Sequence, residues 1–82
     1  MSREKVLAET QSFLGQFIAV EVADDVDIFA AGLVNSLFAM QLVLFLESAF
    51  AIRVENEDLD FDNFRTLNAI AGFVERKVAI AA

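Results

Sequence analysis

The chain has 82 residues, which is enough for one domain with a single core and no separate catalytic domain. Its 13 acidic and 6 basic residues give a net charge of −7, which repels nucleic acid and anionic lipid and favours partners that present Lys and Arg. Because it contains neither cysteine nor histidine, disulfides, thiolate metal sites and a Ser-His catalytic pair are excluded.

No targeting or membrane segment is expected. Residues 1–5 mix charges and lead into no continuous apolar run, unlike a signal peptide. The richest apolar stretch, residues 37–46, is far shorter than the about 20 residues that span a bilayer. We therefore expect one soluble, cytoplasmic domain covering residues 1–82, monomeric, that binds no nucleic acid and no membrane.

The first element in chain order is an amphipathic helix. Apolar residues recur at intervals of three and four from Val6 to Ile18. Ser2 can cap its start.

A long, ordered loop should follow, from Val20 to Asn35. Its acids cluster at residues 24, 25 and 27, and Gly32 suits a positive φ. It has too many apolar residues for a solvated linker, and these should pack against the helices: Val26, Ile28, Phe29 and Leu33. A loop of this length in a compact domain is usually functional.

The second helix is predicted from Ser36 to Phe50, with Asn35 as its N-cap. Eleven of its fifteen residues are apolar, which is more than one buried stripe can use. At 100° per residue one face forms a core seam, made of Ala39, Leu42, Val43, Leu46 and Phe50. The other side carries Leu37, Met40 and Leu44 beside Ser36, Gln41 and Glu47. An exposed apolar patch next to a hydroxyl at a helix start indicates a partner site.

A second acidic stretch, residues 55–62, leads to a short helical turn predicted at residues 63–66 and a last helix capped by Thr66. Its core stripe comprises Leu67, Ile70, Ala71, Val74 and Val78. Gly72 costs roughly 1 kcal/mol there relative to alanine, which indicates close packing against a neighbour. The tail, residues 79–82, is expected to fray.

Three chemical roles for these residues can be weighed. A nucleophilic Ser36 needs a base, and the two lysines, Lys5 and Lys77, lie in the first and last helices. Asp58, Asp60 and Asp62 imitate part of a calcium loop, but Asn63 replaces its glycine and Ala69 its bidentate Glu, so a solvated acidic surface is the stronger interpretation. The remaining role makes Ser36 a substrate, because a helix N-terminus favours a phosphodiester.

Plainer interpretations exist for each feature. A single serine at a helix start is ordinarily a cap or a solvated hydroxyl. The apolar face could be a homodimer seam or could be covered by the long loop. Gln41 and Glu47 could be ordinary surface residues. Five phenylalanines are expected to pack in the core or beneath the loop: Phe29, Phe38, Phe45, Phe61 and Phe73.

The run Asp27-Ile28-Phe29-Ala30-Ala31-Gly32-Leu33-Val34-Asn35-Ser36-Leu37 resembles the signature of the acyl and peptidyl carrier protein family. In that family a D-x-F-x-x-G element leads into D-S-L, and the serine receives 4′-phosphopantetheine from coenzyme A. The resemblance covers nearly the whole chain. It implies an all-α, acyl-carrier-like four-helix bundle with three main helices, one short helix and a long first loop.

On this resemblance Ser36 is the phosphopantetheine attachment residue and Asn35 the helix cap, and the chain is not an enzyme. Asn35 stands where the family has aspartate, so a carboxylate that could help a Mg²⁺-dependent transferase is missing. The second helix keeps only Glu47 of the family's acids. Partner docking is therefore expected to use Leu37, Met40, Gln41, Leu44 and Glu47.

The run from Gly32 to Glu47 resembles free-standing carriers of glyceryl-derived units that become hydroxy-, methoxy- or aminomalonyl extenders for polyketide or polyketide–peptide assembly. The partners implied are a phosphopantetheinyl transferase, an acyl-loading enzyme, acyl-carrier-dependent dehydrogenases, and an acyltransferase or synthase. The alternative is a non-carrier, acidic helical module that binds a partner through the exposed face of the second helix.

Overall fold

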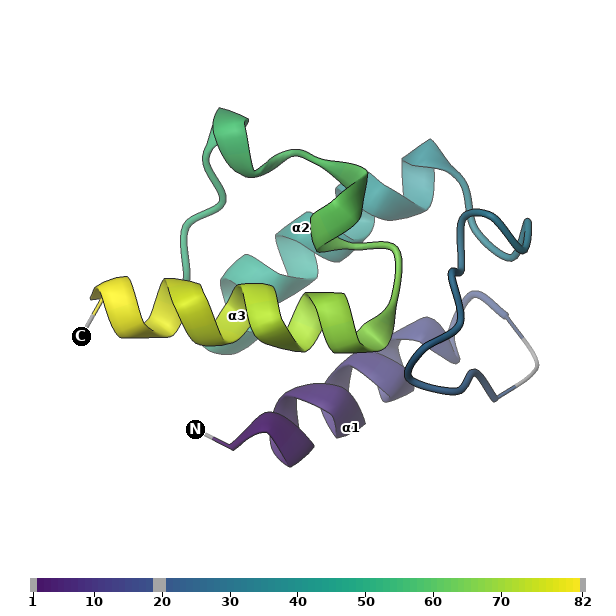
Figure 1. Cartoon of the computed structure of the whole chain (residues 1–82), viewed down its shortest axis with the longest axis horizontal. Coiled ribbons are helices and arrows are strands. Elements are labelled where there is room, and N and C mark those ends of the chain that lie inside the picture. The colour runs from purple at the N-terminus through teal and green to yellow at the C-terminus, as the bar shows by residue number, and fades with distance from the viewer. Residues whose placement is uncertain (1, 19–20, 82) are drawn as a thin grey trace.

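The computed structural model describes residues 2–18 and 21–81. In these ranges it has three α-helices, two short 3-10 helices and no strand: α1 (Arg3–Leu14), α2 (Ser36–Phe50), η1 (Asn56–Asp58), η2 (Phe61–Asn63) and α3 (Leu67–Ala81). Figure 1 shows α3 running beside α1, with α2 behind them and the η1–η2 connection above. Among the described residues, no helix has the length and apolar character needed to cross a membrane. The predicted all-α architecture with three main helices and a long first loop is confirmed.

The predicted helix starts are confirmed by their caps. The Ser2 hydroxyl accepts a hydrogen bond from the Lys5 N–H at 3.2 Å, and the Thr66 hydroxyl accepts one from the Ala69 N–H at 2.9 Å. Each bond satisfies one of the N–H groups that a first helical turn leaves without an intrahelical partner. These short polar side chains therefore fix where α1 and α3 begin.

The first helix ends earlier than its apolar period predicts, at Leu14 instead of near Ile18. The next residue, Gly15, is a poor helix former. After it the backbone changes to the i→i+3 hydrogen bonds of a 3-10 turn, in which the Phe17 N–H donates to the Leu14 carbonyl at 2.9 Å. Val20, the predicted start of the loop, lies outside the described residues.

The buried face of α2 differs slightly from the face that the sequence predicts. Its buried residues are Phe38, Leu42, Leu46 and Phe50. Ala39 and Val43, assigned to the seam from their angular positions, are only half-buried. The reason is that they face the η1–η2 connection, which leaves a cleft beside α2.

The connection between α2 and α3 also differs from its prediction. A single turn was expected at residues 63–66, whereas the structure has two 3-10 turns, at residues 56–58 and 61–63. The acidic side chains cause this, because they bond local backbone: an Asp60 carboxylate oxygen accepts from the Asp62 N–H at 2.9 Å. At the other end, α3 continues through part of the tail predicted to fray and ends at Ala81; Ala82 lies outside the described residues.

Phenylalanine burial follows the prediction with one exception. Phe38 and Phe73 are buried, and Phe29 and Phe45 are half-buried against the core. The expectation for Phe61 is wrong, because 52% of this residue is exposed. Phe61 stands in η2 at the surface, with its ring edge-to-face on Phe29 at a centroid distance of 5.0 Å.

Gly72 has no packing reason to be glycine, contrary to the sequence expectation. A Cβ atom placed on it would meet only Nη1 of Arg76, at 3.7 Å, an ordinary contact with a flexible side chain. Gly72→Ala is therefore expected to raise the free energy of unfolding by about 0.5 to 1 kcal/mol, because alanine loses less backbone entropy in a helix. Urea denaturation with an unchanged m-value checks this.

Gly32 provides the matched control for that substitution. Its φ is +74°, so Gly32→Ala has open space for the Cβ and yet is expected to destabilise the chain. A Gly72→Ala variant that unfolds at lower urea than the wild type would contradict the expectation.

Candidate functional site

The predicted attachment residue, Ser36, is the first residue of α2 and is exposed. Asn35 caps the helix in its place: its φ is −134°, and its side-chain oxygen accepts from the Phe38 N–H at 3.1 Å. The cap predicted for Asn35 is thus confirmed. Within the described residues the Ser36 hydroxyl takes part in no hydrogen bond, so its oxygen is free to react.

The position of Ser36 favours a negatively charged group on that oxygen. The first N–H groups of a helix point out of its N-terminus, and the helix dipole places partial positive charge there. A phosphodiester attached at this point is stabilised by both effects. The chain has no histidine, and no side chain among the described residues hydrogen-bonds the Ser36 hydroxyl, so this part of the structure shows no base that would activate it.

The loop before Ser36 is held in place by the start of α3. The Ile28 N–H donates to the Arg65 carbonyl at 2.8 Å, and the Asn68 N–H donates to the Asp24 carbonyl at 3.0 Å. Ile28 is fully buried. The predicted ordered loop with a buried apolar underside is confirmed for the described residues 21–35.

Asp27 folds the second half of that loop. Its Oδ1 accepts hydrogen bonds from the N–H groups of Phe29 at 3.1 Å and Ala30 at 2.9 Å. Its other oxygen lies 3.7 Å from Nε of Arg65. Gly32 then takes a positive φ of 74°, which turns the chain toward Asn35. The residues of the D-x-F-x-x-G element therefore position the start of α2.

The apolar patch predicted on α2 is at the surface. Leu37, Met40 and Leu44 are 67%, 69% and 67% exposed, and Gln41 is exposed with them. Glu47 differs, because it is half-buried and its Oε2 accepts from the Val54 N–H at 3.0 Å. Its carboxylate therefore holds the chain that leaves α2, a role that its sequence position did not indicate.

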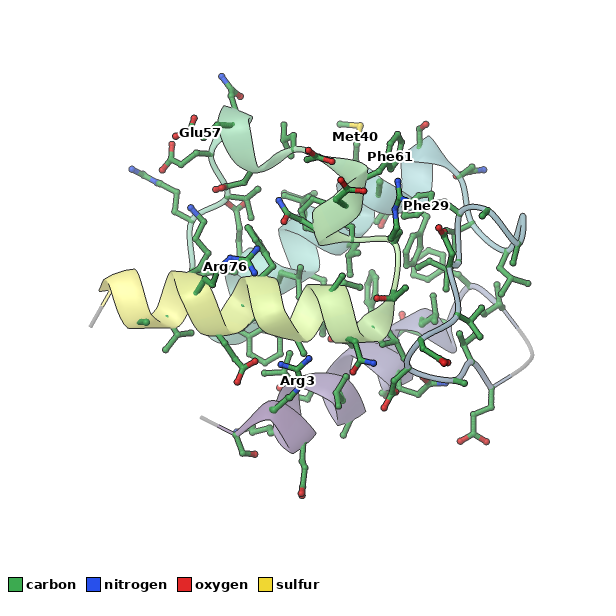
Figure 2. All side chains as sticks on the ribbon, viewed as in Figure 1. Arg3, Phe29, Met40, Glu57, Phe61 and Arg76 are labelled. Carbon is green, nitrogen blue, oxygen red and sulfur yellow. The ribbon has the colours of Figure 1, made fainter. Side chains whose placement is uncertain are left out.

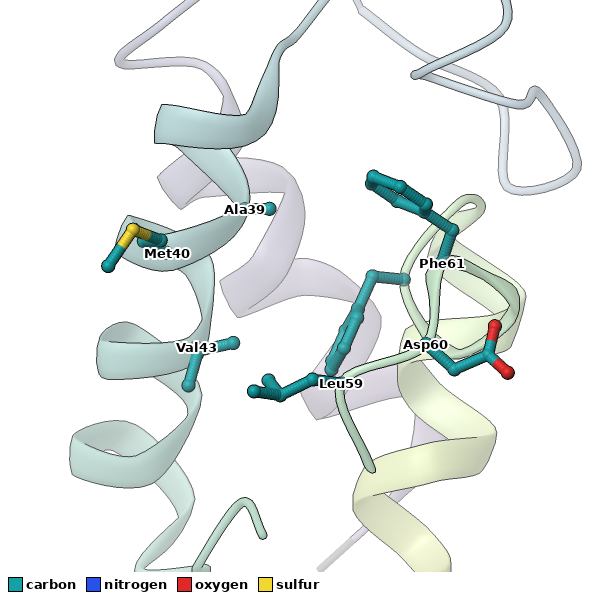
Figure 3. Close-up of a pocket in the computed structure, with 7 residues that line it drawn as sticks. Ala39, Met40, Val43, Leu59, Asp60 and Phe61 are labelled. Carbon is teal, nitrogen blue, oxygen red and sulfur yellow. The ribbon is translucent and has the colours of Figure 1, made fainter. Parts of the chain in front are cut away.

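Two clefts flank α2, each with a volume of about 230 Å³. Cleft A lies between α2 and the η1–η2 connection and is lined by Ala39, Met40, Val43, Leu59, Asp60, Phe61 and Phe64. Figure 3 shows Leu59 and Phe61 directed toward α2 and the Asp60 carboxylate directed away from the cleft. Cleft B lies at the start of α2 and is lined by Phe17, Leu33, Val34, Asn35, Leu37, Phe38 and Gln41. Cleft A is thus almost wholly apolar, whereas cleft B includes two carboxamides.

The outer wall of cleft A is clamped to α3. The Asp58 carboxylate forms an ion pair with Lys77, and both side chains are largely shielded from solvent. Asn63 adds to the clamp: its Nδ2 donates to the Asp58 carbonyl at 2.8 Å, and its Oδ1 accepts from Arg76 at 3.1 Å. Figure 2 shows Arg76 on the side of α3 that faces this connection. The clamp fixes the backbone that carries Leu59 and Phe61.

The clamp predicts a pH dependence of stability. The hydrogen bond from Lys77, with one from the Glu55 N–H, holds the pKa of the Asp58 carboxyl below its ordinary value. A lowered folded-state pKa contributes stability above the ordinary aspartate pKa and loses it as the pH falls toward the folded value. Asp58→Asn is expected to lower stability at neutral pH and to flatten the acid limb of the curve.

Urea unfolding of both proteins between neutral pH and about pH 3 measures this effect. Glu57→Gln makes the same charge change at an exposed neighbour in η1 and is the matched control. Parallel acid limbs for wild type and Asp58→Asn would show that the pair contributes nothing in this range.

A match to a known protein family identifies the kind of protein in which this site occurs. The family described as "Phosphopantetheine attachment site" matches residues 4–74, most of the chain. This chain belongs to the phosphopantetheine carrier protein family. The cofactor of the carrier is therefore covalently attached 4′-phosphopantetheine, and the carrier is not itself catalytic.

The carrier is similar to two proteins named D-alanyl carrier protein. The one from Lactococcus lactis subsp. cremoris is 36% identical over 53 residues, which cover 65% of this chain and 67% of the relative. The one from Streptococcus thermophilus is 34% identical over 67 residues, which cover 79% of this chain and 85% of the relative.

The residues of the carrier fit the cofactor that its family implies. Ser36 offers an exposed oxygen without a hydrogen-bond partner in the described structure, at the positive end of α2. The clefts on either side of this helix provide surface for a flexible arm. The residues that complete these clefts from a distance, among them Leu59 and Phe61, gave no functional signal in the sequence, since only the fold brings them to α2.

Proposed function

We propose that Ser36 carries the 4′-phosphopantetheine arm and that the chain presents an acyl group to other enzymes. In the modification the Ser36 oxygen attacks the β-phosphorus of coenzyme A, a phosphodiester forms, adenosine 3′,5′-bisphosphate leaves, and the hydroxyl proton passes to a base of the transferase. The terminal thiol of the arm then supplies a thioester linkage for the acyl group. The observation that carries the proposal is the exposed, unbonded Ser36 oxygen at the start of α2.

Intact mass after incubation with coenzyme A and a broad-specificity phosphopantetheinyl transferase tests the proposal. We expect a gain of one phosphopantetheine per chain. No gain with several transferases would favour the alternative, an acidic helical module that binds a partner and carries no cofactor.

Partners are proposed to dock on the exposed face of α2, through Leu37, Met40, Gln41 and Leu44, with Glu47 at its edge. The support is the high exposure of the three apolar side chains next to Ser36. The acidic surface favours partners with Lys and Arg around an apolar contact. Met40→Glu should raise the KM of the transferase without lowering the carrier's stability, and an unchanged KM would place the contact elsewhere.

For the cargo we propose a glyceryl-derived unit on its way to a malonyl-type extender, on the resemblance of residues 32–47. The loading enzyme, the acyl-carrier-dependent dehydrogenases and the receiving acyltransferase or synthase named above belong to this proposal. The second candidate is a D-alanyl group, which the names of the two relatives favour and which speaks against a polyketide role.

The mass of the group on carrier isolated from its native host separates the two cargoes. A glyceryl-derived mass supports the extender unit, and an alanyl mass overturns it. In vitro, the same distinction follows from whether a glyceryl-loading enzyme or an ATP-dependent D-alanine ligase acylates the modified chain.

A further inference from the structure

One arginine side chain links the loop before Ser36 to the connection between α2 and α3. Nε of Arg65 lies 3.7 Å from a carboxylate oxygen of Asp27, and Nη2 of Arg65 lies 3.1 Å from a carboxylate oxygen of Asp62. Asp27 belongs to the loop, and Asp62 belongs to η2. The guanidinium therefore stands between two acidic segments that would otherwise repel each other.

The Asp27 end of this link determines the shape of the loop. Oδ1 of Asp27 accepts hydrogen bonds from the N–H groups of Phe29 and Ala30. The turn continues through backbone hydrogen bonds as far as Leu33, two residues before the cap of α2. A fixed Asp27 therefore holds the segment that leads into Ser36.

Two further contacts attach the same loop to the same connection. The Ile28 N–H donates to the Arg65 carbonyl at 2.8 Å. The ring of Phe29 in the loop meets the ring of Phe61 in η2 edge-to-face, with centroids 5.0 Å apart, and Figure 2 shows the two side chains beside each other. Because the backbone bond at Ile28 does not depend on the guanidinium, the ion pairs affect the local order of the loop more than the global fold.

We propose that Arg65 is a positioning residue for the modification of Ser36. Its pair with Asp27 holds the loop in the arrangement that a transferase meets when it reaches the Ser36 hydroxyl. A loop that is already ordered costs little further conformational entropy when the enzyme binds. This inference rests on the proposed attachment at Ser36.

Direct contact between Arg65 and the transferase is the competing role. The carrier is acidic, so its enzymes are expected to present Lys and Arg to it. The charge of Arg65 is already balanced by Asp27 and Asp62. A basic enzyme surface therefore gains little from this guanidinium, whereas it meets the loop that the guanidinium holds.

Steady-state kinetics of the modification, followed by intact mass, test the role. Arg65→Gln is expected to raise the KM of the transferase for the carrier by about twofold to fivefold, the size of a partly exposed ion pair, since the side chains of Arg65 and Asp27 are 46% and 32% exposed. The kcat should stay unchanged, because a smaller ordered fraction lowers the apparent affinity and not the rate of the bound complex. Arg53→Gln removes the same charge at an exposed position beyond the far end of α2, and should keep the wild-type KM.

Asp27→Asn separates positioning from direct contact. Asparagine keeps a side-chain oxygen that can accept from Phe29 and Ala30, but it loses the charge that pairs with Arg65. We expect the same rise in KM, and the double variant should be no worse than either single variant. A rise with Arg65→Gln but not with Asp27→Asn would mean direct contact with the enzyme, and additive effects would mean independent roles; either result overturns the proposal.

Hydrogen exchange of the unmodified chain gives a readout that needs no transferase. Both single variants should exchange the Phe29 and Ala30 N–H groups about twofold to fivefold faster, with the amides of α1 and α3 unchanged. Faster exchange throughout these helices would mean a global loss of stability and would contradict a positioning role.

The recorded masses keep this inference separate from the proposed function. A wild type that takes no arm contradicts attachment at Ser36, and the positioning role with it. A wild type that takes the arm with a KM that neither Arg65→Gln nor Asp27→Asn changes contradicts the positioning role alone.

Discussion

Ser36→Ala is expected to remain folded and to lose phosphopantetheine modification completely. The loss is complete because the hydroxyl oxygen is the atom that would form the phosphodiester, and alanine has none. The fold should survive because Asn35, not Ser36, bonds the Phe38 N–H and caps α2. Alanine is also the best helix former at the vacated position. Intact mass with coenzyme A and a transferase gives the first result, and circular dichroism with thermal unfolding gives the second.

Ser48→Ala is the matched control, since Ser48 is also an exposed serine of α2 but lies inside the helix. It should take up one phosphopantetheine like the wild type. A Ser36→Ala chain that still gains the arm would move the attachment to another hydroxyl and would remove the basis of the proposed function.

The second large effect is expected from Leu46→Ala, in the core of α2. Leu46 is fully buried among the helices, and truncation of a buried leucine loses transfer free energy and leaves a cavity. The expected loss is about 3 kcal/mol in the free energy of unfolding. A domain of this length has a total stability of roughly 4 to 12 kcal/mol, so the substitution should remove about a quarter or more of it and lower the urea midpoint clearly.

Leu44→Ala makes the same chemical change two residues earlier, at a side chain that is 67% exposed. It should change stability by less than about 0.5 kcal/mol, as surface substitutions usually do. Its effect should instead appear as weaker binding to a transferase or another partner. Urea denaturation of both variants measures the contrast. Similar losses of stability would mean that Leu44 is covered in solution, by a second chain or by another segment.

Much of the site followed from local signals in the sequence. The starts of all three helices, the end of α2 at Phe50 and the position of Ser36 beside the cap Asn35 were predicted, and the structure agrees. These features depend on residues within one or two helical turns of each other: capping side chains, apolar period and glycine conformation. Neighbouring residues in the chain meet in any fold that contains the helix, so no knowledge of the tertiary structure is needed.

Other features were wrong or absent in the sequence interpretation because they depend on distant contacts. Gly72 was expected to touch a neighbour and has room for a methyl group, and Phe61 was assigned to the interior and is half-exposed. Which side of an apolar helix is covered depends on where the other segments lie. Periodicity supplies only the angle between side chains.

The sequence alone therefore determined the class of the fold, the helix that presents Ser36 and the apolar side chains beside it. Only the tertiary structure decided that α2 has a cleft on each side, that Glu47 bonds the chain after the helix, and that Asp58 meets Lys77. The physical reason is the range of the interactions. Caps and helical periods act over a few residues, whereas clefts and ion pairs between segments exist only after the helices have packed.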